Sequence, residues 1–253
     1  MASKQPLLTG PAAEARLKTF IAKSSPADQA RIRAARRLLR RQLAGACEMV
    51  LLVLILAASG AAAQGATSPP VVVVFETDKG SIEIEVDAQH APVTAANFLK
   101  YVDGRFYDGG VINRAVRPDT TVRHDVEIQV IQFQIDRNRR RDEFPPIALE
   151  RTSATGLKHV DGTVSMARNG PDTATASFSI VIGDQPEMDF AGKRNPDGQG
   201  FAVFGRVVRG MDVVKAIQKS PTGQRGQYGT ETLDPPIRIV RAHRKYDERD
   251  PDR

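Results

Sequence analysis

The side chains able to do nucleophilic or metal chemistry are few in this sequence and are not spaced for it. Its four histidines, His90, His124, His159 and His243, stand far apart without metal-ligand spacing, so each is expected to be a surface or structural residue. The single cysteine, Cys47, precedes an apolar run and is expected to be removed with it. No Gly-x-Ser-x-Gly motif and no Ser/His/Asp arrangement stands out. No metal or cofactor is therefore expected, and the sequence is compatible with a chemistry that needs none.

Four blocks of sequence say most about this chain. They read FYDGGVINR at 106–114, GTVSMARNG at 162–170, ASFSIVI at 176–182 and GFAVFGRVVRG at 200–210. In that order the blocks resemble the cyclophilin family of peptidyl-prolyl cis/trans isomerases, and the resemblance covers about residues 72–243. It implies a mainly β fold, namely a cyclophilin-like closed eight-stranded antiparallel barrel capped by two α-helices. It also implies an enzyme that isomerises prolyl peptide bonds.

The resemblance makes Arg114 the candidate catalytic residue. In cyclophilins the catalytic arginine lies in a motif similar to FYDGxxFHRV, and Arg114 is in register with it, while Ile112 and Asn113 replace the usual Phe-His. Amide resonance holds a prolyl bond planar behind a barrier of ~18–20 kcal/mol. A guanidinium that donates to the lone pair of the prolyl nitrogen stabilises the twisted state, in which this conjugation is lost. Position alone leaves the alternative that Arg114 forms a salt bridge on the barrel surface.

A family strand that reads roughly FMIQGG matches residues 129–134. Gln132 is then the expected contact to the substrate backbone, Val130 takes the place of a pocket methionine, and Gln129 takes that of a pocket phenylalanine. The last replacement predicts the loss of an aromatic wall. An insertion at 118–128 precedes the strand and could rebuild one side of the groove.

The next blocks place four more residues at the site. The segment 165–168 matches the family's SMAN/SMAR block, so Ala167 and Arg168 are expected to line the groove and present backbone groups to the peptide. In the block that corresponds to SQFFI, Ser177 replaces a glutamine and Ser179 replaces the aromatic residue that floors the proline pocket. Ser179 is the most serious departure, because full burial of a phenyl ring is worth ~1.5–3 kcal/mol.

Two apolar residues are expected to restore part of that floor. Met188 takes the apolar position of a turn similar to the family's x-L-D turn, and Phe201 replaces a histidine or tyrosine on the groove rim. Glu187 stands where eukaryotic members often carry a tryptophan. The resemblance thus implies a groove that retains the polar residues Arg114 and Gln132 of the family but has an altered proline pocket.

Short alternating segments predict the elements that must position these residues. A hairpin is expected over 71–86, and helices over 92–102 and 211–218. Further strands are expected at 111–116, 127–135, 147–150, 163–167, 177–182, 201–207 and 237–242. Many short strands with one helix near each end favour a closed antiparallel barrel, although the pattern alone also allows an open α+β sheet.

Residues 1–63 are typical of a basic leader and signal peptide. The run at 49–63 is uncharged and ends in small residues, and four arginines lie at 36–41 before it. The run is short for a membrane span, which needs ~20 apolar residues. A cleaved signal and a periplasmic or secreted protein are therefore expected, with an uncleaved N-terminal membrane anchor as the alternative. Translation from Met49 is a further alternative, but it would remove the arginines.

The remaining chain is expected to divide into a linker at 64–70, a cyclophilin-like domain at 71–244 and a charged tail at 245–253. The whole chain has a net charge of +6, with 36 Lys+Arg and 30 Asp+Glu. Residues 1–63 hold 10 and 3 of these, which leaves 26 and 27 and a net charge of −1. Because a nucleic-acid binder carries its positive charge on the folded domain, no nucleic-acid partner is expected.

Two functions stay open at this point. The first is a monomeric prolyl isomerase that acts on proline-containing peptides and unfolded exported proteins and assists their folding. The second is a non-catalytic cyclophilin-like module that binds peptides or a protein through a degraded proline pocket. Gln129, Ser177 and Ser179 favour the second hypothesis, whereas Arg114 and Gln132 oppose it. The fold alone does not decide between them.

Overall fold

The computed structural model describes residues 70–224 and 226–245. The predicted signal peptide at 1–63, the linker except for its last residue and the tail except for its first residue lie outside this part of the chain. Among the residues described, no helix is both long and apolar enough to cross a membrane.

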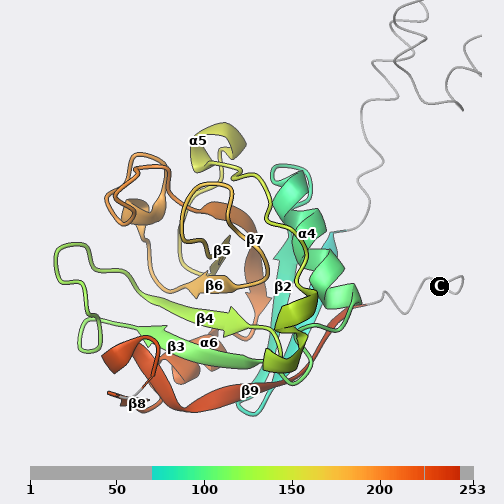
Figure 1. Ribbon diagram of the computed structural model, residues 1–253, viewed down its shortest axis with the longest axis vertical. Coiled ribbons are helices and arrows are strands. Elements are labelled where there is room, and N and C mark those ends of the chain that lie inside the picture. Colours follow the sequence, from blue (N-terminus) through green and yellow to red (C-terminus); the bar gives the residue numbers. More distant parts are fainter. Residues whose placement is uncertain (1–69, 225, 246–253) are drawn as a thin grey trace, which may run out of the picture. The chain divides into compact units, whose positions relative to one another are not determined.

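Eight antiparallel strands in the described part of the chain close into a barrel (Figure 1). Their order around it is β1-β2-β7-β5-β6-β4-β3-β9, and β9 pairs back with β1. The strands are β1 (Val71–Thr77), β2 (Gly80–Val86), β3 (Val111–Val116), β4 (Val130–Gln134), β5 (Thr163–Met166), β6 (Phe178–Val181), β7 (Ala202–Arg209) and β9 (Thr232–Arg244), with the short β8 (Thr222–Gly223) paired to β9. The predicted closed barrel is confirmed, and the open-sheet alternative is wrong.

Two helices complete the core of the barrel, as the resemblance implied. Helix α4 (Pro92–Asp103) packs against β7 and β9, and helix α6 (Met211–Gln218) packs against β2, β3 and β4. Phe98 of α4 and Ile217 of α6 belong to the central apolar cluster. The described residues also contain the one-turn helix α5 (Thr152–Thr155) and the 3-10 segments η1 (Arg137–Asp142), η2 (Pro186–Met188) and η3 (Gly229–Glu231).

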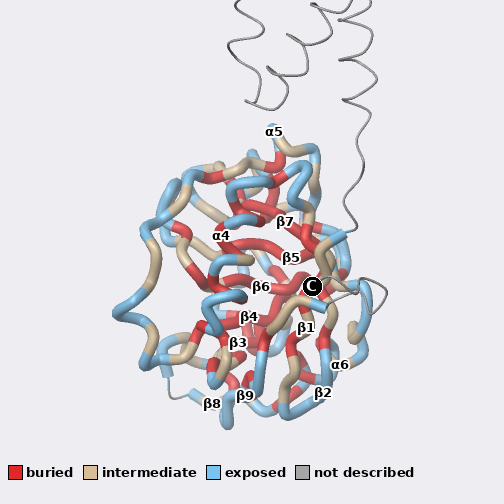
Figure 2. Tube along the Cα trace, turned by 90° about the vertical axis from the view of Figure 1, so that its right-hand side faces the viewer, coloured by how far each residue is buried: buried red, intermediate tan, exposed pale blue. Residues whose placement is uncertain are grey.

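Stacked and edge-on aromatic rings fill the barrel, and Figure 2 shows buried residues concentrated along its strands. Phe178 stacks on Phe133 with ring centroids 4.5 Å apart, and both Phe75 and Phe98 meet the Phe178 ring edge-on at 5.4 Å. Such pairs add to the hydrophobic gain of burying the rings. Phe178 is fully buried, so Ser179, the next residue along the strand, points away from the core.

The strand predicted at 147–150 is wrong. Ile147 forms one isolated bridge with Ala174, and the chain then leaves the sheet. Glu150 turns toward the start of α4, where its carboxylate accepts hydrogen bonds from the Thr94 amide and hydroxyl at 2.7 and 2.6 Å. The first amides of a helix have no partner within the helix. Glu150 supplies acceptors for them, so this segment caps α4 instead of forming a strand.

Candidate active site

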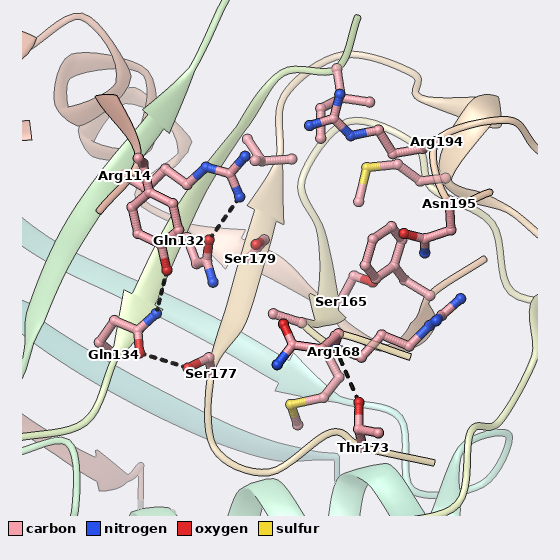
Figure 3. Close-up of a pocket in the computed structure, with 18 of the residues that line it drawn as sticks. Arg114, Gln132, Gln134, Ser165, Arg168, Thr173, Ser177, Ser179, Arg194 and Asn195 are labelled. Carbon is pink, nitrogen blue, oxygen red and sulfur yellow. Dashed lines mark hydrogen bonds between the residues drawn. The ribbon is translucent and has the colours of Figure 1, made fainter. Parts of the chain in front are cut away.

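A groove of about 440 Å³ lies on the faces of β3, β4, β5 and β6 that point away from the core (Figure 3). Apart from Gln129, the residues that the resemblance assigned to the site all line this groove. They are Arg114, Val130, Gln132, Ala167, Arg168, Ser177, Ser179, Met188 and Phe201. The barrel therefore brings together residues that are spread over almost ninety positions of sequence, although their individual roles stay predictions.

Strand alternation explains why the groove receives polar side chains from β4. Val130, Gln132 and Gln134 line the groove, whereas Ile131 and Phe133 between them belong to the barrel core. Successive side chains of a strand point to opposite faces, so one strand supplies both environments. Gln134, which the sequence analysis missed, could have been found from its spacing of two residues after Gln132.

A β-bulge in β3 directs Arg114 out of the core. The pairing register of β3 shifts between Ile112 and Arg114 against both β4 and β9. Ile112 and Ala115 are both fully buried in the core, although strict alternation places residues three apart on opposite faces. The extra residue, Asn113, changes the face on which the following residues lie, so Arg114 points into the groove.

The guanidinium of Arg114 is held by three neighbours. Its Nε and Nη2 lie 2.7 and 2.6 Å from Oε2 of Glu231, and Nη1 donates to Oε1 of Gln132 at 3.2 Å. The guanidinium carbon lies 4.7 Å from the centre of the Tyr228 ring. The Arg114 side chain keeps 20% exposure while that of Glu231 has 1%. The salt bridge raised as an alternative therefore exists, but it orients an arginine that also faces the groove.

Glu231 and Tyr228 were not predicted. Both come from the segment around η3, outside every motif that carried the resemblance, so no local signal pointed to them. The Tyr228 hydroxyl lies 3.4 Å from Nε2 of Gln134, whose Oε1 accepts a hydrogen bond from Ser177 at 2.7 Å. Ser177 is thus part of a polar wall that leads to the arginine.

The insertion at 118–128 builds the neighbouring wall. Its Val122 amide donates to Oε1 of Glu231 at 3.0 Å, and its last residue, Ile128, lines the groove. The expectation that Gln129 stands in the pocket is wrong, because Gln129 is bonded to Gln218 of α6 at 3.3 Å and is not among the groove-lining residues. Ile128 supplies apolar surface instead. It was not predicted, because the insertion obscures the alignment between this strand and the family motif.

One end of the groove is apolar. Ile128, Val130 and Met188 are buried in a cluster separate from the barrel core, together with Val116 and Val181, and Phe201 packs against it. Met188 and Phe201, both expected at the site, therefore lie at this apolar end of the groove, which Ser179 also lines. The cluster offers an apolar surface without an aromatic floor.

Arg168 exposes its backbone to the groove, whereas its guanidinium is buried in an ion pair. Its guanidinium forms two hydrogen bonds to the Asp197 carboxylate, at 2.7 and 2.9 Å, and a third to the Gly200 carbonyl at 2.7 Å. Only 1% of the Arg168 side chain is exposed, although the residue as a whole is half-buried. The same guanidinium lowers the pKa of Asp197 to about 2. The backbone contact expected from Arg168 stays a prediction.

A buried chain of Asp189, His159 and Ser165 ends at the groove, although no Ser/His/Asp arrangement stood out in the sequence. His159 Nδ1 lies 2.7 Å from Oδ1 of Asp189, and its Nε2 lies 2.8 Å from Oγ of Ser165. Ser165 is 1% exposed, and its hydroxyl also lies 3.3 Å from the Ala202 carbonyl oxygen, so we interpret the chain as a brace and not as a nucleophile. Burial lowers the pKa of His159, and this effect is larger than the opposing effect of the Asp189 carboxylate. The imidazole is therefore neutral at pH 7.

The closed barrel, its two helices and a groove around one oriented arginine define a cyclophilin-like protein. Residues 72–244 match the family described as cyclophilin-type peptidyl-prolyl cis-trans isomerase. The chain belongs to this enzyme family, which confirms the resemblance read from the sequence.

Curated relatives and a solved structure agree with this assignment. The chain is 32% identical over 166 residues to a peptidyl-prolyl cis-trans isomerase of Acinetobacter baylyi, covering 65% of this chain and 80% of that one. It is 33% identical over 155 residues to peptidyl-prolyl cis-trans isomerase B of Escherichia coli, covering 61% and 88%. The fold is similar to that of a Cryptosporidium parvum cyclophilin-type isomerase crystallised in the presence of the dipeptide Ala-Pro, with a TM-score of 0.54, 16% identity and 70% and 99% coverage.

Proposed function

We propose that this chain isomerises prolyl peptide bonds of exported proteins and that Arg114 weakens amide conjugation at the prolyl nitrogen. The observation that carries the proposal is the position of the Arg114 guanidinium. It is fixed by Glu231 and Gln132 in the same groove as the apolar cluster of Ile128, Val130 and Met188. Isomerisation by this mechanism requires only a positioned cation and an apolar surface for the proline ring, and the groove provides both.

In the proposed mechanism the proline ring rests on the apolar cluster, and the flanking carbonyls are held by Gln132 and by the Arg168 amide, because the Ala167 amide already donates to the Ser177 carbonyl. As the bond twists, the nitrogen lone pair leaves the amide π system and accepts a hydrogen bond from Arg114. Planar amide nitrogen is a poor acceptor, so this bond is stronger in the twisted state and therefore lowers the barrier. A hydrogen bond from a charged donor is worth ~1.5–3 kcal/mol, which corresponds to roughly ten- to hundredfold in rate.

Export is supported by the sequence of the leader. The arginines at 36–41 followed by the uncharged run at 49–63 form the pattern of a secretory signal. The proposal therefore places the mature protein in the periplasm or outside the cell. Expression of the full chain, cell fractionation and N-terminal sequencing test it, with a mature N-terminus near residue 64 in the exported fraction as the expected result. An intact chain in the cytoplasm would contradict export.

The catalytic proposal is tested by exchange NMR on a Xaa-Pro peptide, with the wild-type protein beside Arg114→Ala. We expect fast cis/trans exchange with the wild type and at least a tenfold slower exchange with Arg114→Ala. Arg209→Ala is the matched control, because Arg209 is an exposed arginine of β7 that lies near Glu83, away from the groove. Peptide binding without acceleration would favour the alternative, a non-catalytic module that binds proline-containing peptides.

A further inference from the structure

A second arginine, Arg194, reaches the groove from the wall opposite Arg114. Figure 3 shows the two side chains extending toward the same end of the groove. Arg194 is only 8% exposed, and its Nη1 donates to the Val126 carbonyl of the insertion at 2.8 Å. A guanidinium so far removed from bulk water lacks hydration that an exposed arginine keeps.

The loop after η2 holds Arg194 in place. The Arg194 amide donates to the Glu187 carbonyl at 3.0 Å, the Lys193 amide donates to the Glu187 carboxylate at 2.8 Å, and Arg123 donates to the Arg194 carbonyl at 2.7 Å. A Cβ on Gly192 would collide with the Glu187 carbonyl oxygen, so the loop packs too tightly there for another residue type. These contacts fix the Arg194 backbone, and the bond from Nη1 to the Val126 carbonyl holds its guanidinium, so binding costs little further ordering of this side chain.

The charges at this end of the groove do not balance. Arg114 pairs with Glu231, and Arg123 pairs with Asp125 at 2.7 Å. Among the ion pairs formed by residues 70–224 and 226–245, none includes Arg194. Three guanidinium groups thus face two carboxylates, which leaves one positive charge in excess.

An excess positive charge in this groove is electrostatically unfavourable. Burial, and then the nearby charges of Arg114 and Arg123, lower the pKa of Arg194 from its ordinary value. A buried charge without a counter-ion destabilises a protein unless something else compensates it. An anion that enters the groove would supply that compensation.

We infer that Arg194 forms a subsite for one carboxylate of the peptide, so that the groove prefers prolyl peptides with an acidic group beside the proline. The inference rests on the proposed function and names its substrate class. A guanidinium matches the planar fork of a carboxylate. One excess positive charge also balances a carboxylate, whereas a phosphate group carries about −1.5 to −2 at pH 7.

The test compares peptides that differ only in charge next to the proline. Blocked peptides carry Glu or Gln immediately before the proline, or Glu or Gln immediately after it. A fifth peptide ends in a free carboxylate at the proline and distinguishes a chain terminus from an acidic side chain. Exchange NMR gives kcat/KM for each peptide with the wild type, with Arg194→Gln, and with Arg209→Gln as the charge-matched control.

We expect one Glu peptide, or the peptide with the free terminus, to be preferred by about tenfold over its neutral counterpart, as one charge-assisted hydrogen bond would give. The preference should vanish in Arg194→Gln, persist in Arg209→Gln and weaken with added salt. Equal rates for every charged and neutral pair would overturn the inference, and so would a preference that survives Arg194→Gln.

A phosphoserine peptide that is preferred above all carboxylate peptides would also overturn the carboxylate assignment. Failure of the proposed function looks different, because then no peptide, neutral or acidic, is accelerated. In that case chemical-shift titration with the same peptides still decides the subsite, since it measures binding and not turnover. Tighter binding of an acidic peptide that depends on Arg194 supports the subsite, and equal binding refutes it.

Discussion

Nη2 of Arg114 lies 2.6 Å from Oε2 of Glu231, a carboxylate that is almost completely buried beneath the groove. The other oxygen of the same carboxylate accepts a hydrogen bond from the Val122 amide, so Glu231 fixes both the candidate catalytic guanidinium and the wall beside it. Catalysis in this protein should therefore depend on a residue that does not touch the substrate. Glu231 acts as a positioning residue for Arg114.

Glu231→Gln is expected to lower kcat by about tenfold while leaving KM nearly unchanged, because the amide keeps the size of the side chain but loses the charge and one of the two oxygens that accept from Arg114 and from the Val122 amide. Exchange NMR over a range of peptide concentrations measures both values. Glu231→Asp keeps the charge and should retain more activity than Glu231→Gln. Glu127→Gln, on an exposed side chain, is the control. If the Glu231→Gln enzyme matched the wild type, the positioning role would be wrong.

The apolar cluster of the groove should contribute to both stability and substrate binding. Met188→Ala removes a buried side chain that packs with Val130 and Val181, and such truncations cost about 2–5 kcal/mol of unfolding free energy. We expect weaker peptide binding as well, because the cluster is the proposed surface for the proline ring. Met188→Leu preserves the volume and should cost less than about 1.5 kcal/mol. Urea unfolding and NMR titration test both variants, and peptide affinity unaffected by Met188→Ala would place the proline elsewhere.

The brace through His159 predicts a pH dependence of stability. The folded pKa of His159 lies below its unfolded value of 6.5, so the unfolded chain binds a proton more readily. The stability contributed by the neutral imidazole is thus complete above pH 6.5 and is lost as the pH falls from there toward the folded pKa. Asp189 and Lys158 are the charged groups that influence this titration.

We expect the urea midpoint of the wild type to fall between pH 7.5 and 5.5 by more than that of His159→Gln, which cannot titrate. The difference between the two proteins isolates this histidine from the other three. Parallel curves for the two proteins over this range would show that His159 does not become protonated on unfolding.

Glu150 stabilises the start of α4 from a distant part of the chain. Its carboxylate accepts hydrogen bonds from the Val93 and Thr94 amides at 3.0 and 2.7 Å, where negative charge also interacts favourably with the helix dipole. Glu150→Gln is expected to reduce the unfolding free energy by about 0.5–2 kcal/mol, the usual range for loss of a helix cap. Urea denaturation measures it, again beside Glu127→Gln. Equal losses in the two variants would mean that general charge, and not the cap, is responsible.

The resemblance of four sequence blocks to a known family was sufficient to predict the barrel and nine groove residues, whereas the strand pattern by itself also allowed an open sheet. Local pattern agrees with the motif match, because alternation along β4 and β6 assigns Gln132 and Ser179 to one face and Phe133 and Phe178 to the other. The aromatic core depends on the same alternation. The motif match required no knowledge of which distant segments meet, whereas a period of two assigns faces of a strand but not the closure of the sheet.

The tertiary structure alone decided how Arg114 is held and what lies opposite it. Glu231 is 117 positions away from Arg114, and Arg194 comes from a loop whose shape depends on contacts with the insertion. The bulge at Asn113, which turns Arg114 outward, is a feature of pairing with two neighbouring strands. These relationships arise only when the barrel closes, because hydrogen bonds and ion pairs between distant residues leave no periodic trace in the sequence.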